Sequence, residues 1–305
     1  AEVKATSDDL DNSEKDTFTN HRQSLEHYGF LVYWILIVSD ESSTSSITVS
    51  GTTSSKPKKG KSRGTEVTDW SAHKIKAFDL IARLLDIKIT KIWTLTPERQ
   101  TFIGLFTKPA FQIFEDPATS KSHTKEIKHR AFRILGLCIK YYGYMFAAQT
   151  TIMQDLQYWE HSAEPMAELL KYLIEKLDYT QLADEILREI SNKEFKDVSS
   201  KEVKDSPNAK TFAAFLIKLT ELSPKTILKN LGLLIHQLGS ESYTMRMAII
   251  EALGGLIIEL TQHMDDNHSQ KEQINGFFDI LEERMLDPIA FVRSKVLQTY
   301  LRILE

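Results

Sequence analysis

"ESYTMRMAIIEALGGLI" (residues 241–257) and "PIAFVRSKVLQTYLRIL" (residues 288–304) are two copies of one amphipathic helix. Placed one over the other, they align Met245 with Val292 and Arg246 with Arg293. The aligned residues are 47 positions apart. A weaker third copy is "EIKHRAFRILGLCIK" (residues 126–140). Self-similarity at a fixed period indicates that the chain is built from stacked repeats.

The helical period also governs the rest of the chain from Asp69 onward. One stripe at helical spacing consists of Met166, Leu169, Leu170, Leu173, Ile174 and Leu177. No run of alternating apolar and polar residues predicts a β-strand. The period of 47 lies at the upper end of the roughly 40–47 residues of HEAT-type helix pairs. The sequence therefore predicts an all-α fold, an α-solenoid of HEAT-type helix pairs.

The composition changes along the chain and predicts four segments. Residues 1–17 are polar and acidic and are expected to be disordered, whereas residues 18–38 are expected to form a helix. The Ser/Thr-rich, basic stretch 39–68 has too few apolar residues to offset the entropy of ordering, so we expect a disordered loop. Residues 69–305 are predicted to form the solenoid, as a fragment of a longer array.

The helix at residues 290–304 has more apolar residues than one partner helix can cover. Because a single helix pair cannot bury both of its faces, pairs stack and each covers its neighbour. We therefore expect a further repeat to cover the surplus apolar face, which consists of Val296, Leu297, Leu301 and Leu304.

Charged residues at the turns of the repeat are expected to be structural. Asp287 and Arg293 correspond to the turn acid and second-helix base of such repeats, which form a ladder between neighbouring turns. Arg246 matches Arg293, but Ser240 stands where the acid would be. The ladder is therefore expected to be incomplete at Ser240.

The sequence gives no basis for catalysis. The net charge is −4, and the single cysteine excludes an internal disulfide framework. Cys138 lies in an apolar helical stretch, which is typical of a packed thiol. His263, Asp265, Asp266 and His268 lie close together, but their spacing matches no known metal cage. We expect no enzyme activity, cofactor, metal or small-molecule substrate. The apolar run 30–38 is too short to span a membrane, so no membrane association is expected.

Two basic groups are candidates for contact with DNA or another phosphate. The first consists of Lys56, Lys58, Lys59, Lys61 and Arg63, and the second includes Lys121, Lys125, Lys128, Arg130 and Arg133. A dense group of positive charges can contact a DNA backbone or act in nuclear import, and neither role requires a folded structure. The alternatives are a solvated tether for the first group and a solvated helix face for the second.

Aromatic residues are candidates for binding a partner protein. Tyr158, Trp159 and His161 belong to a cluster larger than one helix face can bury. Interface hot spots favour Trp and Tyr, although core packing is the alternative. In a polar linker, Ser206 precedes Pro207 and is a candidate site for a proline-directed kinase, whereas Ser223 before Pro224 is expected to cap a helix.

Four stretches resemble one family in particular, the HEAT-repeat subunit 1 of condensin. They are "HRQSLEHYGFLVYWIL" (21–36), "IMQDLQYWEHSAEPM" (152–166), "TFAAFLIKLTELSPKTILKNLGLLIHQL" (211–238), and the pair "SESYTMRMAIIEALGGLI" (240–257) and "DPIAFVRSKVLQTYLRIL" (287–304). Their order and spacing agree with the family, and the similarity covers most of residues 18–305 apart from the Ser/Thr-rich loop.

The resemblance implies a fragment from the N-terminal part of a much longer solenoid. It implies a non-catalytic scaffold that binds the kleisin, can engage an SMC ATPase head and supports mitotic chromosome condensation. It further implies residence in the nucleus and on chromosomes, with a cytoplasmic pool as well. The alternative is a generic HEAT-repeat adaptor, such as a nuclear transport receptor or a phosphatase scaffold.

Overall fold

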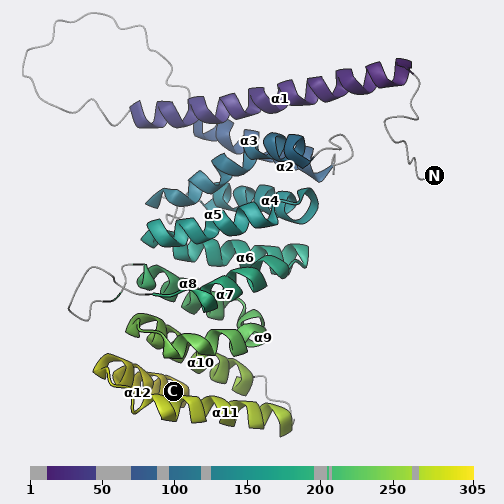
Figure 1. The fold of residues 1–305 in the computed structure, drawn as a ribbon. Coiled ribbons are helices and arrows are strands. Elements are labelled where there is room, and N and C mark those ends of the chain that lie inside the picture. The colour runs from purple at the N-terminus through teal and green to yellow at the C-terminus, as the bar shows by residue number, and fades with distance from the viewer. Residues whose placement is uncertain are drawn as a thin grey trace, which may run out of the picture. The chain divides into compact units, whose positions relative to one another are not determined.

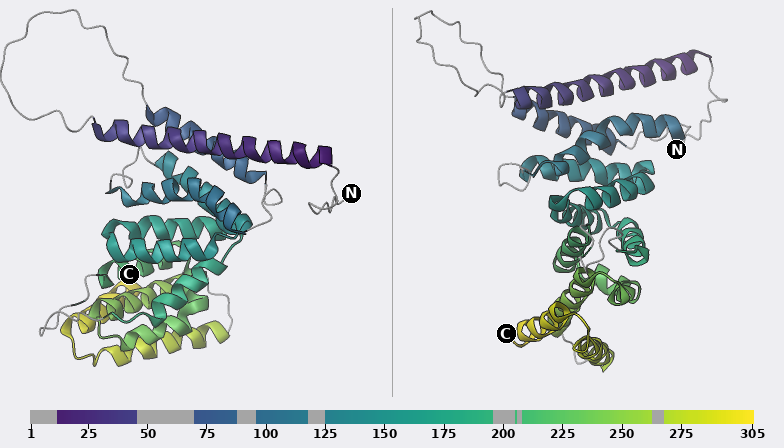
Figure 2. Two further views of the ribbon diagram at one scale, coloured as in Figure 1. Left: turned by 45° about the horizontal axis from the view of Figure 1, so that its top comes forward. Right: turned by 60° about the vertical axis from the view of Figure 1, so that its left-hand side comes forward.

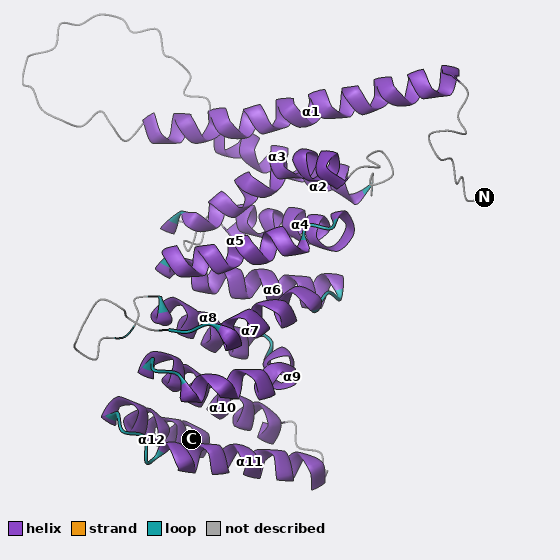
Figure 3. Cartoon of the chain, in the orientation of Figure 1, coloured by secondary structure: helices purple, strands orange, loops and turns teal. Residues whose placement is uncertain are grey.

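The fold is α-helical throughout the described part of the chain (Figures 1 and 3). The computed structural model describes residues 12–45, 70–87, 96–117, 125–195, 205, 208–262 and 268–305, and it has no β-strand within these ranges. The all-α solenoid prediction is confirmed. The chain divides after Gly143 into two compact units, each of which is described by itself.

The first unit contains four helices within the residues that the structure describes. They are α1 (Asn12–Ser45), α2 (Trp70–Asp86), α3 (Thr96–Glu115) and α4 (Lys125–Tyr142). Both α1 and α4 pack against α2 and α3. The helices approach closely at Gly29 of α1, where a Cβ atom would lie 2.9 Å from the Phe102 ring. The buried hydroxyl of Tyr142 donates to the carbonyl oxygen of Leu85 at 2.8 Å and ties α4 to α2.

Helix α1 is longer at both ends than the range 18–38 that the sequence predicts. The prediction followed the apolar residues, which mark only the part of a helix that packs. Adding residues to an existing helix avoids the cost of nucleation, so polar residues can extend it at either end. Most of the predicted loop 39–68 lies outside the described residues, as does most of segment 1–17.

The described part of the second unit contains eight α-helices. They are α5 (Met145–Tyr158), α6 (Ala163–Leu177), α7 (Gln181–Asn192), α8 (Ala209–Leu222), α9 (Pro224–Leu234), α10 (Tyr243–Gln262), α11 (His268–Arg284) and α12 (Ala290–Leu304). Helices α6, α8, α10 and α12 pack one on the next, and α5, α7 and α9 do the same. The right-hand view of Figure 2 separates these two layers in the green and yellow part of the chain.

Helix α10 shows why the helix pairs stack. It lies between α8 and α12 and also contacts α9 and α11, so it buries residues on several faces. Helix α12 buries one stripe, Val292, Val296 and Thr299. The prediction that Val296 belongs to the surplus apolar face is therefore wrong, because it lies on the stripe that α12 buries. Leu297, Leu301 and Leu304 are exposed, as that prediction requires.

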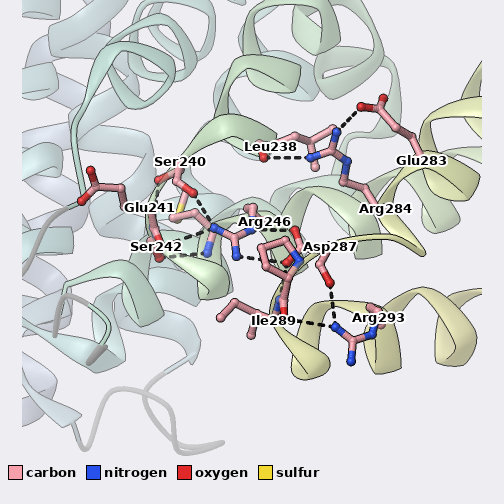
Figure 4. A network of polar contacts seen from close by, with 12 residues as sticks. Leu238, Ser240, Glu241, Ser242, Arg246, Glu283, Arg284, Asp287, Ile289 and Arg293 are labelled. Carbon is pink, nitrogen blue, oxygen red and sulfur yellow. Dashed lines mark hydrogen bonds and ion pairs between the residues drawn. The ribbon is translucent and has the colours of Figure 1, made fainter. Parts of the chain in front are cut away.

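A buried ion pair joins the two copies of the repeat (Figure 4). Arg246 Nε of α10 lies 3.0 Å from Asp287 Oδ2, and both side chains are at most 10% exposed. Arg246 Nη2 also donates to Asp287 Oδ1 at 3.2 Å. The same carboxylate oxygen accepts the backbone N–H of Ile289 at 2.9 Å, so the acid also fixes the turn before α12.

The two matching arginines make the same contacts with the backbone. Arg246 Nη1 donates to the carbonyl oxygens of Ser240 and Glu241, and Arg293 Nη1 donates to those of Asp287 and Pro288. Ser240 contributes no carboxylate, but its carbonyl oxygen accepts a bond of 2.6 Å from Arg246. A missing acid therefore leaves the backbone part of the ladder in place.

A second set of contacts between neighbouring helix pairs uses Gln237 and Arg284, which occupy equivalent repeat positions. Gln237 Nε2 donates to the carbonyl oxygens of Ile190, Ser191 and Lys193, within or just after the last turn of α7. Arg284 Nη1 donates in the same way to the carbonyl oxygen of Leu238 at 3.3 Å. These bonds add side-chain donors to carbonyl groups at the end of a helix, where few backbone N–H groups remain to meet them.

Substitution of Asp287 tests the importance of the ion pair. We expect Asp287→Ala to lower the free energy of unfolding by about 3–5 kcal/mol, because it leaves the buried Arg246 charge without its acid. Arg293→Ala is the matched control, since within the described ranges this exposed arginine bonds to backbone carbonyl groups alone, and its effect should be small. Urea unfolding measures the change in the free energy of unfolding for both variants. Equal losses of stability in the two variants would contradict the argument.

Substitution of Gly254 tests the close approach of α10 and α12. A Cβ atom at Gly254 would lie 2.4 Å from Thr299 Cγ2. We expect Gly254→Ala to cost about 1–3 kcal/mol through overpacking, and Thr299→Ser to restore part of this stability by removing the clashing methyl group. The control is Gly276→Ala in α11, where a Cβ atom meets nothing within 4 Å. It should stabilise the protein by up to about 1 kcal/mol through helix propensity. No recovery in the Gly254→Ala, Thr299→Ser double variant would contradict this explanation.

Candidate partner-binding site

The three predicted aromatic residues lie together at the turn between α5 and α6. Helix α5 ends at Tyr158, and Trp159 has an extended backbone (φ −124°, ψ 107°). The rings of Trp159 and His161 are tilted against each other, with their centroids 6.0 Å apart. The exposed fraction is 70% for Tyr158 and 44% for Trp159. Core packing therefore does not account for Tyr158, and it accounts for only part of Trp159.

Hydrogen bonds within the turn hold Trp159 in place. Its backbone N–H donates to the carbonyl oxygen of Asp155 at 2.9 Å. The buried Ser162 hydroxyl lies 3.0 Å from the same carbonyl oxygen and 2.8 Å from that of Trp159. The indole is thus presented from an ordered backbone, which lowers the entropic cost when a partner binds.

A further exposed aromatic residue lies at the other end of α5. Phe146 is 71% exposed and, with Thr150, Gln154 and Tyr158, forms a row at spacing i, i+4. Over twelve residues a helix rises about 18 Å, so this row is long enough for an extended segment of several residues. Phe146 could not be identified from the sequence, because a lone Phe within a helical pattern is normally a core residue.

The charge beside this turn is acidic. Glu160 and Glu164 are exposed, and Glu164 lies 3.6 Å from Lys218 Nζ. Exposed indole and phenol rings next to carboxylates suit a partner with apolar or cationic side chains, because cations are attracted to aromatic faces.

The basic residues that the structure describes are partly engaged in ion pairs. Lys125 is exposed and Lys128 is half-buried at the start of α4. In the same helix, Arg130 pairs with Asp79 at 2.8 Å, and the hydrogen bond to this carboxylate raises the arginine pKa. Arg133 pairs with Asp86 at 3.3 Å. Two members of this predicted group thus serve contacts between α2 and α4.

Several predicted sites lie outside the described residues. They are Lys56, Lys58, Lys59, Lys61, Arg63, Lys121, Ser206, His263, Asp265 and Asp266. Contact with DNA, nuclear import and phosphorylation at these positions remain predictions.

The remaining candidates can be placed in the structure. Ser223 occupies the N-cap position of α9, but its side chain makes no capping bond, and its carbonyl oxygen accepts from Thr226 instead. Burial raises the pKa of the Cys138 thiol. Among the described residues, no group of three or more His, Cys, Asp or Glu could hold a metal, and no helix has the length and apolar character to cross a bilayer.

Comparison with known proteins agrees with the resemblance in the sequence. Residues 1–148 match the family model of non-SMC mitotic condensation complex subunit 1, N-terminal part. Condensin complex subunit 1 of Saccharomyces cerevisiae is 35% identical over 281 residues, which are 91% of this chain and 23% of the yeast protein. That of Schizosaccharomyces pombe is 31% identical over 303 residues, 98% of this chain and 25% of the relative.

The similarity extends beyond fungi. Condensin complex subunit 1 of Homo sapiens is 26% identical over 250 residues, 82% of this chain and 18% of the human protein. The chain thus spans about a quarter or less of the curated relatives it matches. The matches cover both structural units and the repeat pair. The resemblance to condensin complex subunit 1 is therefore confirmed over nearly the whole of this chain.

Proposed function

We propose that this chain is a non-catalytic scaffold segment of condensin that binds the kleisin subunit. The observation that carries the proposal is the ordered aromatic turn, where Tyr158 and Trp159 are exposed beside His161. A disordered partner loses entropy when it becomes ordered, so its affinity rests on a few anchoring side chains. The resemblance to condensin complex subunit 1 supports the kleisin as the partner that meets these anchors.

Engagement of an SMC ATPase head is the second part of the proposal. A stack of helix pairs offers separate surfaces, so one chain can hold two partners at once. Together these contacts would support mitotic chromosome condensation and place the protein in the nucleus and on chromosomes. Direct contact with DNA through Lys125 and Lys128, or through the basic residues outside the described ranges, is a further part of the same proposal.

The alternative is a generic HEAT-repeat adaptor, such as a nuclear transport receptor or a phosphatase scaffold. A condensin scaffold and a generic adaptor differ in the partner protein that they bind. We expect the chain to co-purify with a condensin kleisin fragment at stoichiometric ratio and to leave an importin cargo peptide and a phosphatase catalytic subunit unbound. Retention of either of the last two, with no retained kleisin, would favour the adaptor.

Substitution of Trp159 tests the proposed anchor. We expect Trp159→Ala to weaken kleisin binding by about 2 kcal/mol or more, roughly thirtyfold, because hot-spot residues dominate such interfaces. Isothermal titration with the kleisin fragment measures the affinity. Leu233→Ala is a matched control, since Leu233 is 37% exposed on α9 and lies away from the aromatic turn.

Thermal melting of the same variants separates binding from stability. Substitution of a core tryptophan by alanine would lower the free energy of unfolding by about 3–5 kcal/mol. Because Trp159 is partly exposed, we expect the melting temperature of Trp159→Ala to fall by much less than that of a core variant. A large fall, with normal affinity of the folded fraction, would assign Trp159 a structural role alone.

A further inference from the structure

Helix α2 of the first unit exposes a row of alternating basic and aliphatic side chains. Lys76, Leu80 and Arg83 lie on the helix at spacing i, i+4, i+7, and Ile87 follows its last residue. An α-helix turns by about 100° per residue, so the three helical positions fall within about 60° of its circumference. The backbone N–H of Ile87 donates to the carbonyl oxygen of Leu84 at 3.3 Å, so the chain continues to turn there. We call Lys76, Leu80, Arg83 and Ile87 the α2 stripe.

The side chains of the α2 stripe are all exposed. The exposed fraction is 56% for Leu80 and 69% for Ile87, and Lys76 and Arg83 are exposed as well. A single exposed aliphatic side chain is common and needs no explanation. Here each aliphatic residue follows a cation along the same row, so one partner can make apolar and charged contacts at once. Aliphatic contacts supply affinity, whereas charged groups supply specificity and a high rate of association.

Neither cation of the α2 stripe forms an ion pair with a described residue. Helix α2 itself has two acids, and both are paired with arginines of α4. Asp79 Oδ1 lies 2.8 Å from Arg130 Nε. Asp86 Oδ2 lies 3.3 Å from Arg133 Nη2. The acids of α2 thus serve its contact with α4 and not the cations of the stripe.

The helices beside α2 do not neutralise the stripe either. Helices α1 and α4 both pack against α2, and among their described side chains each contributes one acid, Glu26 and Glu126. Glu26 lies 3.1 Å from Arg22 of its own helix, and Glu126 lies 2.9 Å from Arg130 of its own helix. The α2 stripe therefore presents an excess of positive charge, which attracts an acidic partner and repels a basic one.

We propose that the α2 stripe binds an acidic amphipathic helix of another protein. Carboxylates of this helix pair with Lys76 and Arg83, and its aliphatic side chains cover Leu80 and Ile87. The two cations are seven residues apart, which is about 10 Å along α2. Acids seven residues apart on a partner helix match this distance, and aliphatic residues between and beyond them match the rest of the stripe.

The aliphatic members of the stripe favour a protein helix over a nucleic acid. A DNA backbone would also meet the two cations, but its phosphates offer Leu80 and Ile87 no apolar surface. The α2 stripe shares no residue with the aromatic turn between α5 and α6, so this inference does not rest on the proposed function.

The test uses the whole 305-residue chain and fluorescent helical peptides. Each peptide carries two Glu and two Leu residues that alternate at spacing i, i+4, i+7, i+11, in both orders, on a background of Ala and Gln. In the control peptides Lys replaces Glu. Fluorescence polarisation should show saturable binding of the Glu peptides, weakened by salt, and at least about tenfold weaker binding of the Lys peptides. Absence of binding, or equal binding of the two kinds of peptide, would overturn the proposal.

Substitutions within the stripe locate the binding site. Arg83→Glu should weaken binding of the Glu peptides at least about tenfold. Leu80→Gln removes an aliphatic contact and should weaken it about fivefold. The matched control is Lys108→Glu, which changes the net charge by the same amount at an exposed position of α3 and should bind like the parent. Unchanged affinity in Arg83→Glu or in Leu80→Gln would contradict the assignment of the site.

A charge reversal guards the test against unfolding. The double variant Lys76→Glu, Arg83→Glu should bind the Lys peptides more tightly than the Glu peptides. Loss of folded protein cannot create this new preference, so a double variant that still prefers the Glu peptides would refute the proposal. All variants should melt as the parent does, because the substituted side chains are exposed.

Two other occupants are distinguished by further measurements. A DNA duplex that the parent binds more tightly than the Glu peptides, and that Arg83→Glu releases, would overturn the proposal in favour of a nucleic acid. A parent chain that sediments as a dimer and becomes a monomer with Arg83→Glu would also overturn it, because the occupant would then be a second copy. Trp159→Ala should keep full affinity for the Glu peptides, which separates this inference from the proposed function.

Discussion

A pair of amphipathic helices has more apolar surface than the pair itself can cover, and this constraint shapes the second unit. Helix α10 is covered by α8 on one side and α12 on the other, which explains why it is apolar around much of its circumference. The constraint also requires polar groups at the helix ends to find partners in the next pair. Arg246 and Asp287 do so as a buried ion pair, and Gln237 does so through carbonyl groups of the preceding pair.

The candidate partner-binding site arises where the regular stack is interrupted. At Trp159 the chain leaves the helical conformation, and two aromatic rings that a continuous helix would distribute over its faces become exposed at one turn. A stack of identical helices would expose the same side chains in every repeat. A local departure from the repeat therefore exposes side chains that the other repeats do not.

The fold could be predicted from the sequence because the period of 47 residues and the helical stripes are local patterns. The pairing of Arg246 with Asp287 could be predicted only in part, since the aligned copies identify the residue types but not which acid meets which base. Gln237 and Arg284 escaped prediction because their partners are backbone carbonyl groups, which have no sequence signature. Val296 was assigned to the wrong face because the neighbouring Leu297 is also apolar, and only packing distinguishes the two.

In the second unit, polar interactions at the helix ends join the pair of α9 and α10 to α7 on one side and to α11 and α12 on the other, which makes stability there largely a sum of local terms. The aromatic turn joins α5 and α6, and α8 packs against both of these helices and against the turn itself. A destabilising substitution in α8 therefore also weakens the support of Tyr158 and Trp159. The shape of the turn thus depends on a helix further along the chain, and not only on the two helices that it joins.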